Sequence, residues 1–146
     1  NLVRSNFKGT VYPINPKASD ILGCKAYPSL TAIPGKVELV VICVPNTLVP
    51  SVMEEPGIKG AEAVIVITAG FKELGKEGGL LERKVGEIAK KYGMRVLGPN
   101  CMGIMNTHHL MNITFTNIHP MAGSIAIASQ SGRGAAPCWT GPQSPR

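Results

Sequence analysis

The stretch Arg95–Gly103, with the sequence RVLGPNCMG, contains the residue types that most clearly suggest ligand binding in this chain. A short aliphatic run ends there at Gly98, Pro99 and Asn100, and a cysteine follows before the next glycine. Glycine is free in φ, proline has a fixed φ and no N–H donor, and asparagine tolerates unusual dihedral angles. A strand that ends in such a stiff, polar turn predicts a loop that holds a ligand.

The cysteine of this loop, Cys101, could act as a nucleophile, but no histidine or other base adjoins it in sequence. Nucleophilic thiols are activated by such a base or by a lowered pKa, so we interpret Cys101 as a lining residue. The cysteines at 24, 43 and 138 form no close pair and have no histidine at a zinc-site spacing. The sequence therefore predicts neither a disulfide scaffold nor a metal site. Cys43, inside the apolar run LVVICV, is expected to be buried.

Short apolar runs predict the strands that would position such loops. They cover residues 9–14, 39–44, 63–68 and 94–97, and a fifth run covers 124–129. Near-continuous apolar runs without alternation are typical of parallel strands that are covered on both faces.

Two helices are predicted between these strands. One is brief, covers residues 48–55, and is expected to end at Pro56 and Gly57. The other covers residues 79–92, where apolar residues recur at steps of three and four, and Gly93 is its predicted C-cap. The order strand, loop, helix, strand predicts an open α/β sheet with right-handed crossovers.

Open α/β sheets bind ligands beyond the carboxyl ends of their strands, so the residues after each strand form the candidate site. Four such segments are rich in Gly, Pro, Asn or Thr, namely Asn15-Pro16-Lys17, Pro45-Asn46-Thr47, Ala69-Gly70-Phe71 and 98–103. No GxGxxG phosphate loop is present. Residues 1–7 look like the end of a helix, and we interpret the chain as one that begins after such a loop.

The composition narrows the class of protein. The chain has 146 residues, of which 44% are hydrophobic and 5% aromatic, which predicts one globular domain with an aliphatic core. Its net charge is +6, but the basic residues are scattered and no aromatic residues lie among them, which argues against a nucleic-acid partner. No apolar run approaches the ~18 residues of a membrane-spanning helix. The N-terminus shows no signal sequence, so a cytoplasmic protein is expected.

Six segments in order resemble the CoA-binding domain of the NDP-forming acyl-CoA synthetase superfamily. They are FKGTVYPINPK (7–17), ILGCKAYPSL (21–30), VPNTLVP (44–50), VIVITAGFKELGKEG (64–78), GMRVLGPNCMGIMN (93–106) and SIAIASQSG (124–132). The superfamily includes ADP-forming acetate–CoA ligases, the succinyl-CoA ligase α subunit, and protein lysine acetyltransferases that carry this module. The acetate-type branch is the better match.

The resemblance implies a Rossmann-like CoA-binding domain over residues 1–120, with the first strand and glycine-rich loop missing. It also implies the first strand of a flavodoxin-like second domain over 121–132. Residues 133–146 do not match the family. A shifted reading frame across 137–142 can encode the family's Leu-Leu-Asp-Trp-Ala, so we interpret this tail as non-native.

The resemblance also assigns roles to individual residues. Lys17 would contact the nucleotide end of CoA, because an ammonium pairs with phosphate; an ordinary solvated lysine is the alternative. Asn100 and Cys101 would lie near the thioester end, although Asn100 could simply cap the turn. Further positions would line the cofactor, namely Val44, Pro45, Ile67, Thr68 and Ala69. A helix beginning at Ser129, Ser131 and Gly132 would stabilise a phosphohistidine.

The implied activity is that of the CoA-binding part of an ADP-forming acyl-CoA ligase, which joins a small carboxylic acid to CoA. The phosphohistidine would lie outside this chain, and His108, His109 and His119 match no family histidine. ADP or ATP, with Mg²⁺, would bind to a partner ATP-grasp β subunit or domain, and the complete protein is expected to be an oligomer.

The alternative function is that of a CoA-binding regulatory module of a lysine acetyltransferase. An NAD-binding domain is disfavoured, because Asn15-Pro16-Lys17 stands where an acidic residue would bind the ribose. The chain alone is expected to be inactive and to bind CoA weakly or not at all.

Overall fold

The computed structural model describes residues 1–116 and 118–131, and these residues divide into two compact units. The sheet unit is Val11–Cys101, and the hairpin unit joins Asn1–Thr10 to the described residues from Met102 onward. Residues 132–146, which include Gly132 and the unmatched tail, lie outside the described part.

A three-stranded parallel sheet forms the centre of the sheet unit. Its strands are β3 (Leu39–Ile42), β4 (Ala63–Val66) and β5 (Arg95–Leu97), in the order β3-β4-β5. Val40 pairs with Val64, and Val64 pairs with Val96. The strands are shorter than predicted, but three of the predicted apolar runs do form this sheet, and its α/β class is confirmed.

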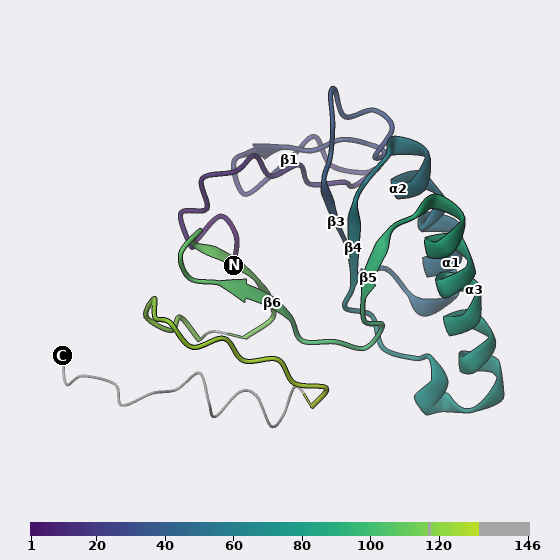
Figure 1. The fold of residues 1–146 in the computed structure, drawn as a ribbon. Coiled ribbons are helices and arrows are strands. Elements are labelled where there is room, and N and C mark those ends of the chain that lie inside the picture. Colours follow the sequence, from purple (N-terminus) through teal and green to yellow (C-terminus); the bar gives the residue numbers. More distant parts are fainter. Residues whose placement is uncertain (117, 132–146) are drawn as a thin grey trace. The chain divides into compact units, whose positions relative to one another are not determined.

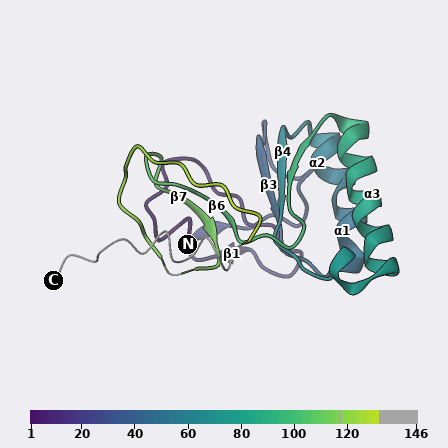
Figure 2. The same cartoon turned by 60° about the horizontal axis from the view of Figure 1, so that its bottom comes forward.

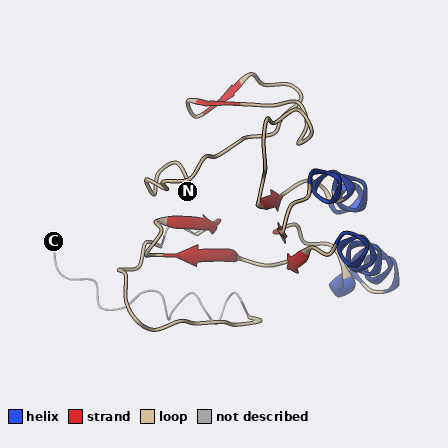
Figure 3. Ribbon diagram, turned by 45° about the horizontal axis from the view of Figure 1, so that its top comes forward, coloured by secondary structure: helices blue, strands red, loops and turns tan. Residues whose placement is uncertain are grey.

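The helices of the sheet unit lie on one face of this sheet (Figures 1 and 3). Between β3 and β4 come η1 (Asn46–Leu48), α1 (Val49–Val52) and α2 (Glu54–Lys59). Between β4 and β5 come η2 (Lys72–Leu74) and α3 (Lys76–Tyr92).

The prediction for the first helix was wrong at its end. Pro56 and Gly57 lie inside α2, which ends at Gly60 in the left-handed conformation. A proline is tolerated in the first turn because the N–H groups there have no partner within the helix. The α3 helix was predicted correctly in kind, and it ends at Gly93 with φ +68°, although it begins three residues earlier than predicted.

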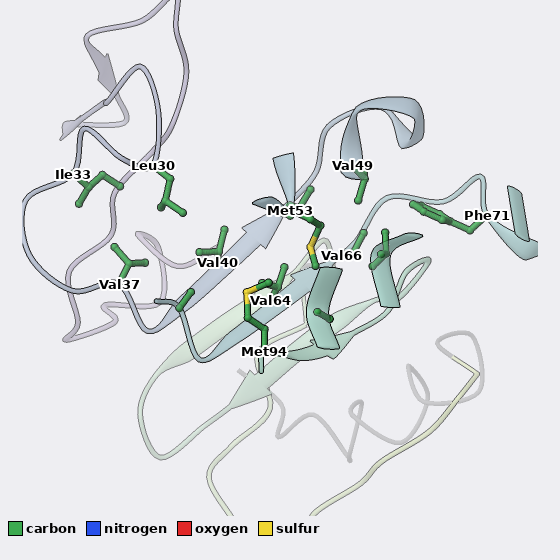
Figure 4. Packing of buried hydrophobic residues seen from close by; sticks show 14 residues of the cluster. Leu30, Ile33, Val37, Val40, Val49, Met53, Val64, Val66, Phe71 and Met94 are labelled. Atoms are coloured by element: carbon green, nitrogen blue, oxygen red, sulfur yellow. The ribbon is translucent and has the colours of Figure 1, made fainter. Parts of the chain in front are cut away.

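The core lies between the helices and the helix-facing side of the sheet (Figure 4). Val64 and Val66 of β4 are completely buried, as are Val49 of α1, Met53 between α1 and α2, and Phe71. Complete burial of one such side chain contributes ~2 kcal/mol through the apolar surface removed from water. The aliphatic core predicted from the composition is thus confirmed.

The other sheet face is covered unevenly, so the prediction of strands buried on both faces is met only in part. Ile65 is buried, but Leu97 is 43% exposed. Cys43 is also exposed, and its predicted burial was wrong. Side chains alternate between the two faces of a strand, so Cys43 continues the face of Leu39 and Val41. Val40 and Ile42 lie on the opposite face, which packs against the helices.

The predicted strand over residues 9–14 was also wrong, because it is reduced to one bridge. Ile14 pairs with Tyr27 in parallel, and the Tyr27 N–H donates to the Pro13 carbonyl at 2.9 Å. Pro13 has no N–H to extend the ladder. A small hairpin of β1 (Asp20–Ile21) and β2 (Cys24–Lys25) lies between Ile14 and Tyr27 in the sequence.

The hairpin unit contains the antiparallel strands β6 (Gly103–Asn106) and β7 (Met111–Thr114), seen in a second orientation in Figure 2. The Asn1 side-chain amide donates to the carbonyls of Thr114 and Thr116, both at 2.7 Å. Residues 124–129 form no strand and are exposed, so this prediction was wrong. A strand requires hydrogen bonds to a neighbour, and no described segment pairs with this one.

Candidate functional site

The loops that follow β3, β4 and β5 meet at one edge of the sheet, because parallel strands place their carboxyl ends together. The Thr68 hydroxyl, two residues past β4, donates to the Val44 carbonyl past β3 at 2.7 Å. The Asn100 N–H, past β5, donates to the Thr68 carbonyl at 2.9 Å. Thr68 therefore joins both neighbouring loops. Three of the four predicted loops are brought together here, and we call them the edge loops.

The first and second edge loops also make a close polar contact. The Asn46 amide donates to the Gly70 carbonyl at 2.6 Å. Gly70 has φ +100°, and a Cβ atom there would lie 2.6 Å from the Asn46 amide nitrogen. The positive φ favours glycine, and a Cβ atom would also displace the Asn46 amide from its hydrogen bond, so the glycine of the TAG sequence at 68–70 has a structural reason.

The second and third edge loops are joined by Glu73, a residue to which the sequence analysis assigned no role. Its Oε1 accepts a hydrogen bond from the Gly70 N–H at 2.7 Å and another from the Asn100 amide at 3.0 Å. The hydrogen bond from Gly70 lowers the pKa of this carboxyl, and the positive charge of Lys72 also favours the carboxylate. The only sequence signal was a carboxylate three residues after Gly70, within TAGFKE.

Asn100 has φ +54°, a left-handed conformation that asparagine tolerates better than most residues. Its side chain is exposed, and within the described part of the chain its Oδ1 makes no hydrogen bond. Cys101 is half-buried, with Sγ 3.3 Å from the Val66 carbonyl oxygen and 3.8 Å from that of Leu97. These contacts hold the sulfur against the ends of β4 and β5.

The remaining predicted lining residues surround the same edge. Val44 and Ile67 are half-buried, and the Ile67 N–H donates to the Ile42 carbonyl at 3.0 Å. Pro45 and Ala69 are exposed. Lys17 is exposed as well, and its N–H donates to the Asn15 side chain at 2.9 Å in a local turn. That turn follows the single Ile14 bridge and takes no part in the hydrogen bonds among the edge loops.

Two of the residues predicted to begin a helix, Ser129 and Ser131, lie at the end of the described chain. The Ser131 N–H donates to the Ser129 hydroxyl, and that hydroxyl lies 3.1 Å from the Ser131 carbonyl oxygen. Both serines are exposed and lie outside the helices of the described chain, and such a bond from a serine hydroxyl to nearby backbone is typical of a turn or a cap. Gly132 lies outside the described residues.

A hollow in the hairpin unit was not anticipated from the sequence. It measures about 570 Å³, and its walls come from Phe7–Gly9 and from the turn that contains His108 and His109. All nine Asp and Glu residues of the chain lie between Asp20 and Glu87, so none belongs to this unit.

In the part of the chain that the structure describes, no group of three or more His, Cys, Asp or Glu side chains is placed to hold a metal ion. Among the same residues, no helix is long and apolar enough to span a membrane.

Comparison with known proteins identifies the class to which this sheet and its edge loops belong. The family model described as CoA binding domain matches residues 1–107. The chain therefore belongs to the CoA-binding domain family, as its motifs implied.

Two curated relatives and one solved structure narrow this class. The chain is 52% identical over 127 residues to "Acetate--CoA ligase [ADP-forming] I" of Archaeoglobus fulgidus, covering 87% of this chain and 18% of the relative. It is 49% identical over 124 residues to "Acetate--CoA ligase [ADP-forming] II subunit alpha" of Pyrococcus furiosus, covering 85% and 27%.

The solved structure is the dinucleotide forming acetyl-coenzyme A synthetase 1 of Ca. Korarchaeum cryptofilum, in complex with phosphate and ADP. It matches with a TM-score of 0.75 and 44% identity, over 78% of this chain and 24% of that chain. This likeness confirms the Rossmann-like fold class. The chain spans less than a third of each of these three proteins.

Proposed function

We propose that this chain is the CoA-binding part of an ADP-forming acyl-CoA ligase, and that CoA binds at the edge loops. The observation that carries the proposal is the set of hydrogen bonds through Thr68, which joins all three loops at the edge where parallel sheets bind ligands. The match of the CoA-binding family model to residues 1–107 supports the same ligand.

The donors and acceptors at this edge fit such a ligand. Val44, Pro45, Ile67, Thr68 and Ala69 offer main-chain groups and small side chains to the cofactor. Asn100 offers a side-chain carbonyl oxygen that has no hydrogen-bond partner among the described residues, and Cys101 would line the end where the CoA thiol would lie. The exposed ammonium of Lys17 suits the phosphates of the nucleotide. When bound, CoA supplies a thiol for transfer of an acyl group, and the role of these residues is to hold and orient it.

For the complete protein we propose the reaction acyl-CoA + ADP + phosphate ⇌ acid + ATP + CoA, with a small carboxylic acid as the substrate. A phosphohistidine and an ATP-grasp β subunit or domain that binds ADP or ATP with Mg²⁺ would come from the length of the relatives that this chain does not span. Ser129, Ser131 and Gly132 would begin the helix that faces the phosphohistidine. We further propose a cytoplasmic oligomer. The names of the ADP-forming ligases, one of them an α subunit, support the ligase over an acetyltransferase module.

A titration of the ¹⁵N-labelled chain with CoA, followed by NMR, tests the ligand. Resonances of the edge loops are expected to shift, with a dissociation constant on the order of 1 mM, because Lys17 and the loops supply only part of a full set of phosphate contacts. Lys17→Gln should weaken CoA binding about tenfold, the lower end of the value of one charge-assisted hydrogen bond. Lys84→Gln, an exposed lysine of α3, is the matched control. An edge that does not respond to CoA, or equal effects of the two variants, would overturn the proposed site.

A further inference from the structure

Glu73 has two hydrogen-bond partners on different edge loops, and both bonds end on the same carboxylate oxygen, Oε1. One partner is the main chain of Gly70, which fixes where the carboxylate lies. The other is the side-chain amide of Asn100. Glu73 itself is exposed and forms no ion pair among the described residues, whereas its neighbour Lys72 pairs with Glu82 at 3.3 Å.

A carboxylate can only accept hydrogen bonds, so the atom of Asn100 that faces Glu73 must be the Nδ2 donor and not the Oδ1 acceptor. The carboxamide of Asn100 is planar, and its oxygen therefore points away from Glu73. Within the described part of the chain, that oxygen has no hydrogen-bond partner. The main chain of Asn100 is fixed separately, through its N–H and the Thr68 carbonyl at 2.9 Å.

We propose that Glu73 is a positioning residue that sets the orientation of the Asn100 carboxamide, so that the edge presents a hydrogen-bond acceptor to its ligand. This inference rests on the proposed CoA site. The acceptor selects a ligand group that carries a proton, such as an amide N–H or the S–H of the pantetheine arm. A group that only accepts, such as a carboxylate or a thiolate, meets a lone pair at this position and is disfavoured.

Removal of either the donor or the acceptor tests this orientation. Asn100→Asp removes the donor to Glu73 and sets two carboxylates against each other. Glu73→Ala removes the acceptor and frees the carboxamide to rotate. In the NMR titration with CoA, each of these changes is expected to weaken binding about fivefold, as the loss of one directed hydrogen bond does. Glu73→Gln alone should have a smaller effect, because its amide oxygen still accepts.

Glu87→Gln, an exposed glutamate on α3, is the matched control and should leave CoA binding unchanged.

A readout without CoA separates this proposal from the proposed function. The side-chain NH₂ resonances of Asn100 should move as the Glu73 carboxylate is titrated with acid, and this movement should be absent in Glu73→Gln and retained in Glu87→Gln. If the Asn100 side-chain resonances shift with pH in the same way in Glu73→Gln and in the unchanged chain, the positioning role is overturned, even if CoA binds. A coupled Asn100 resonance in a chain that shows no response to CoA would overturn the proposed ligand and leave the Glu73–Asn100 pair standing. Equal CoA affinity of Glu73→Ala and the unchanged chain would also overturn the positioning role.

Discussion

At the scale of single residues, Thr68 is the side chain on which the geometry of the edge depends most directly. It is half-buried, its hydroxyl reaches the loop after β3, and its carbonyl accepts from the loop after β5. The side-chain bond and the main-chain bond are independent, so a substitution can remove the first and keep the second. This separates the role of the hydroxyl from that of the backbone.

Thr68→Val, which keeps the shape but deletes the hydroxyl, should lower the free energy of unfolding by about 1 kcal/mol, the net value of one hydrogen bond. The Val44 carbonyl loses its donor at 2.7 Å in this variant. Thr47→Val is the matched control, because Thr47 is exposed and its side chain makes no hydrogen bond among the described residues. Urea denaturation measures both values, and equal stabilities of the two variants would contradict the role assigned to Thr68.

Among the residues of this edge, the loops could be predicted from the sequence, but the role of Glu73 could not. The edge loops could be predicted, because a parallel sheet puts the ends of its strands together whatever the details of packing. Glu73 could not be assigned, because its role depends on contacts with Gly70 and with Asn100, and the latter lies 27 positions away in sequence. The roles of Lys17, Asn100 and Cys101 as cofactor contacts remain predictions.

At the scale of elements, the junction between Phe71 and the start of α3 is unusually close. A Cβ atom on Gly78 would lie 1.8 Å from the Phe71 carbonyl oxygen, whereas a Cβ atom on the adjacent Gly79 would meet nothing within 4 Å. Both residues are helical positions of α3. The packing of this junction therefore requires glycine at position 78 and leaves room for a larger residue at position 79.

Gly78→Ala should destabilise the sheet unit by about 2 kcal/mol or more, because main-chain atoms that cannot rotate away must shift. Gly79→Ala should instead stabilise it by about 0.5–1 kcal/mol, since alanine loses less backbone entropy than glycine in a helix. Thermal unfolding followed by circular dichroism compares the two directly. A destabilising Gly79→Ala or a neutral Gly78→Ala would contradict this packing.

The ends of α2 and α3 are joined by Glu54, which accepts from the Tyr92 hydroxyl at 2.6 Å and from the Lys91 ammonium at 3.0 Å. The hydrogen bond from Tyr92 has the larger effect, and together with that from Lys91 it lowers the pKa of Glu54 below its ordinary value of 4.5. A carboxyl whose pKa is lower in the folded than in the unfolded state stabilises the fold above its ordinary pKa. That stabilisation is lost as the pH falls through the folded-state pKa.

Tyr92→Phe should therefore lower the free energy of unfolding at pH 7, and the difference from the unchanged chain should shrink below pH 4.5, where Glu54 becomes protonated. Tyr12→Phe is the control, because the Tyr12 ring packs against Tyr27 and its hydroxyl makes no hydrogen bond among the described residues. Urea denaturation at several pH values gives the comparison. A Tyr92→Phe effect that is the same at pH 3 and pH 7 would argue against the Glu54 bond.

Helices and strands could be predicted where the sequence pattern that defines them lies within the element itself. The α3 helix has its own apolar periodicity and its own glycine cap, and β3, β4 and β5 are apolar runs separated by helices. The runs over 9–14 and 124–129 looked equally apolar but form no regular strand in the described chain. A strand forms only beside a neighbouring strand with free hydrogen-bonding groups, and the local sequence does not determine which neighbour is available.

At the scale of the whole molecule, packing differs strongly along the chain. The central strand β4 has three buried residues of four, and it is paired on both sides by β3 and β5. Residues 121–131 are all exposed, including Met121 at 88% and Ile125 at 86%. Protection against hydrogen exchange depends on buried, bonded amides, so these two segments should mark the extremes of the described chain.

Hydrogen–deuterium exchange followed by NMR tests this ordering residue by residue. The amides of Val64, Ile65 and Val66 are expected to exchange slowest, through global unfolding, because β4 cannot open without breaking the sheet. The amides of Ile125 and Ile127 should exchange at rates close to those of an unfolded peptide. Slow exchange at alternate positions from 124 to 129 would show that the apolar run SIAIAS is a paired strand in solution, as its sequence alone suggested. Uniformly fast exchange there, beside a protected β4, would place the stable core of this chain in its parallel sheet and the helices packed upon it.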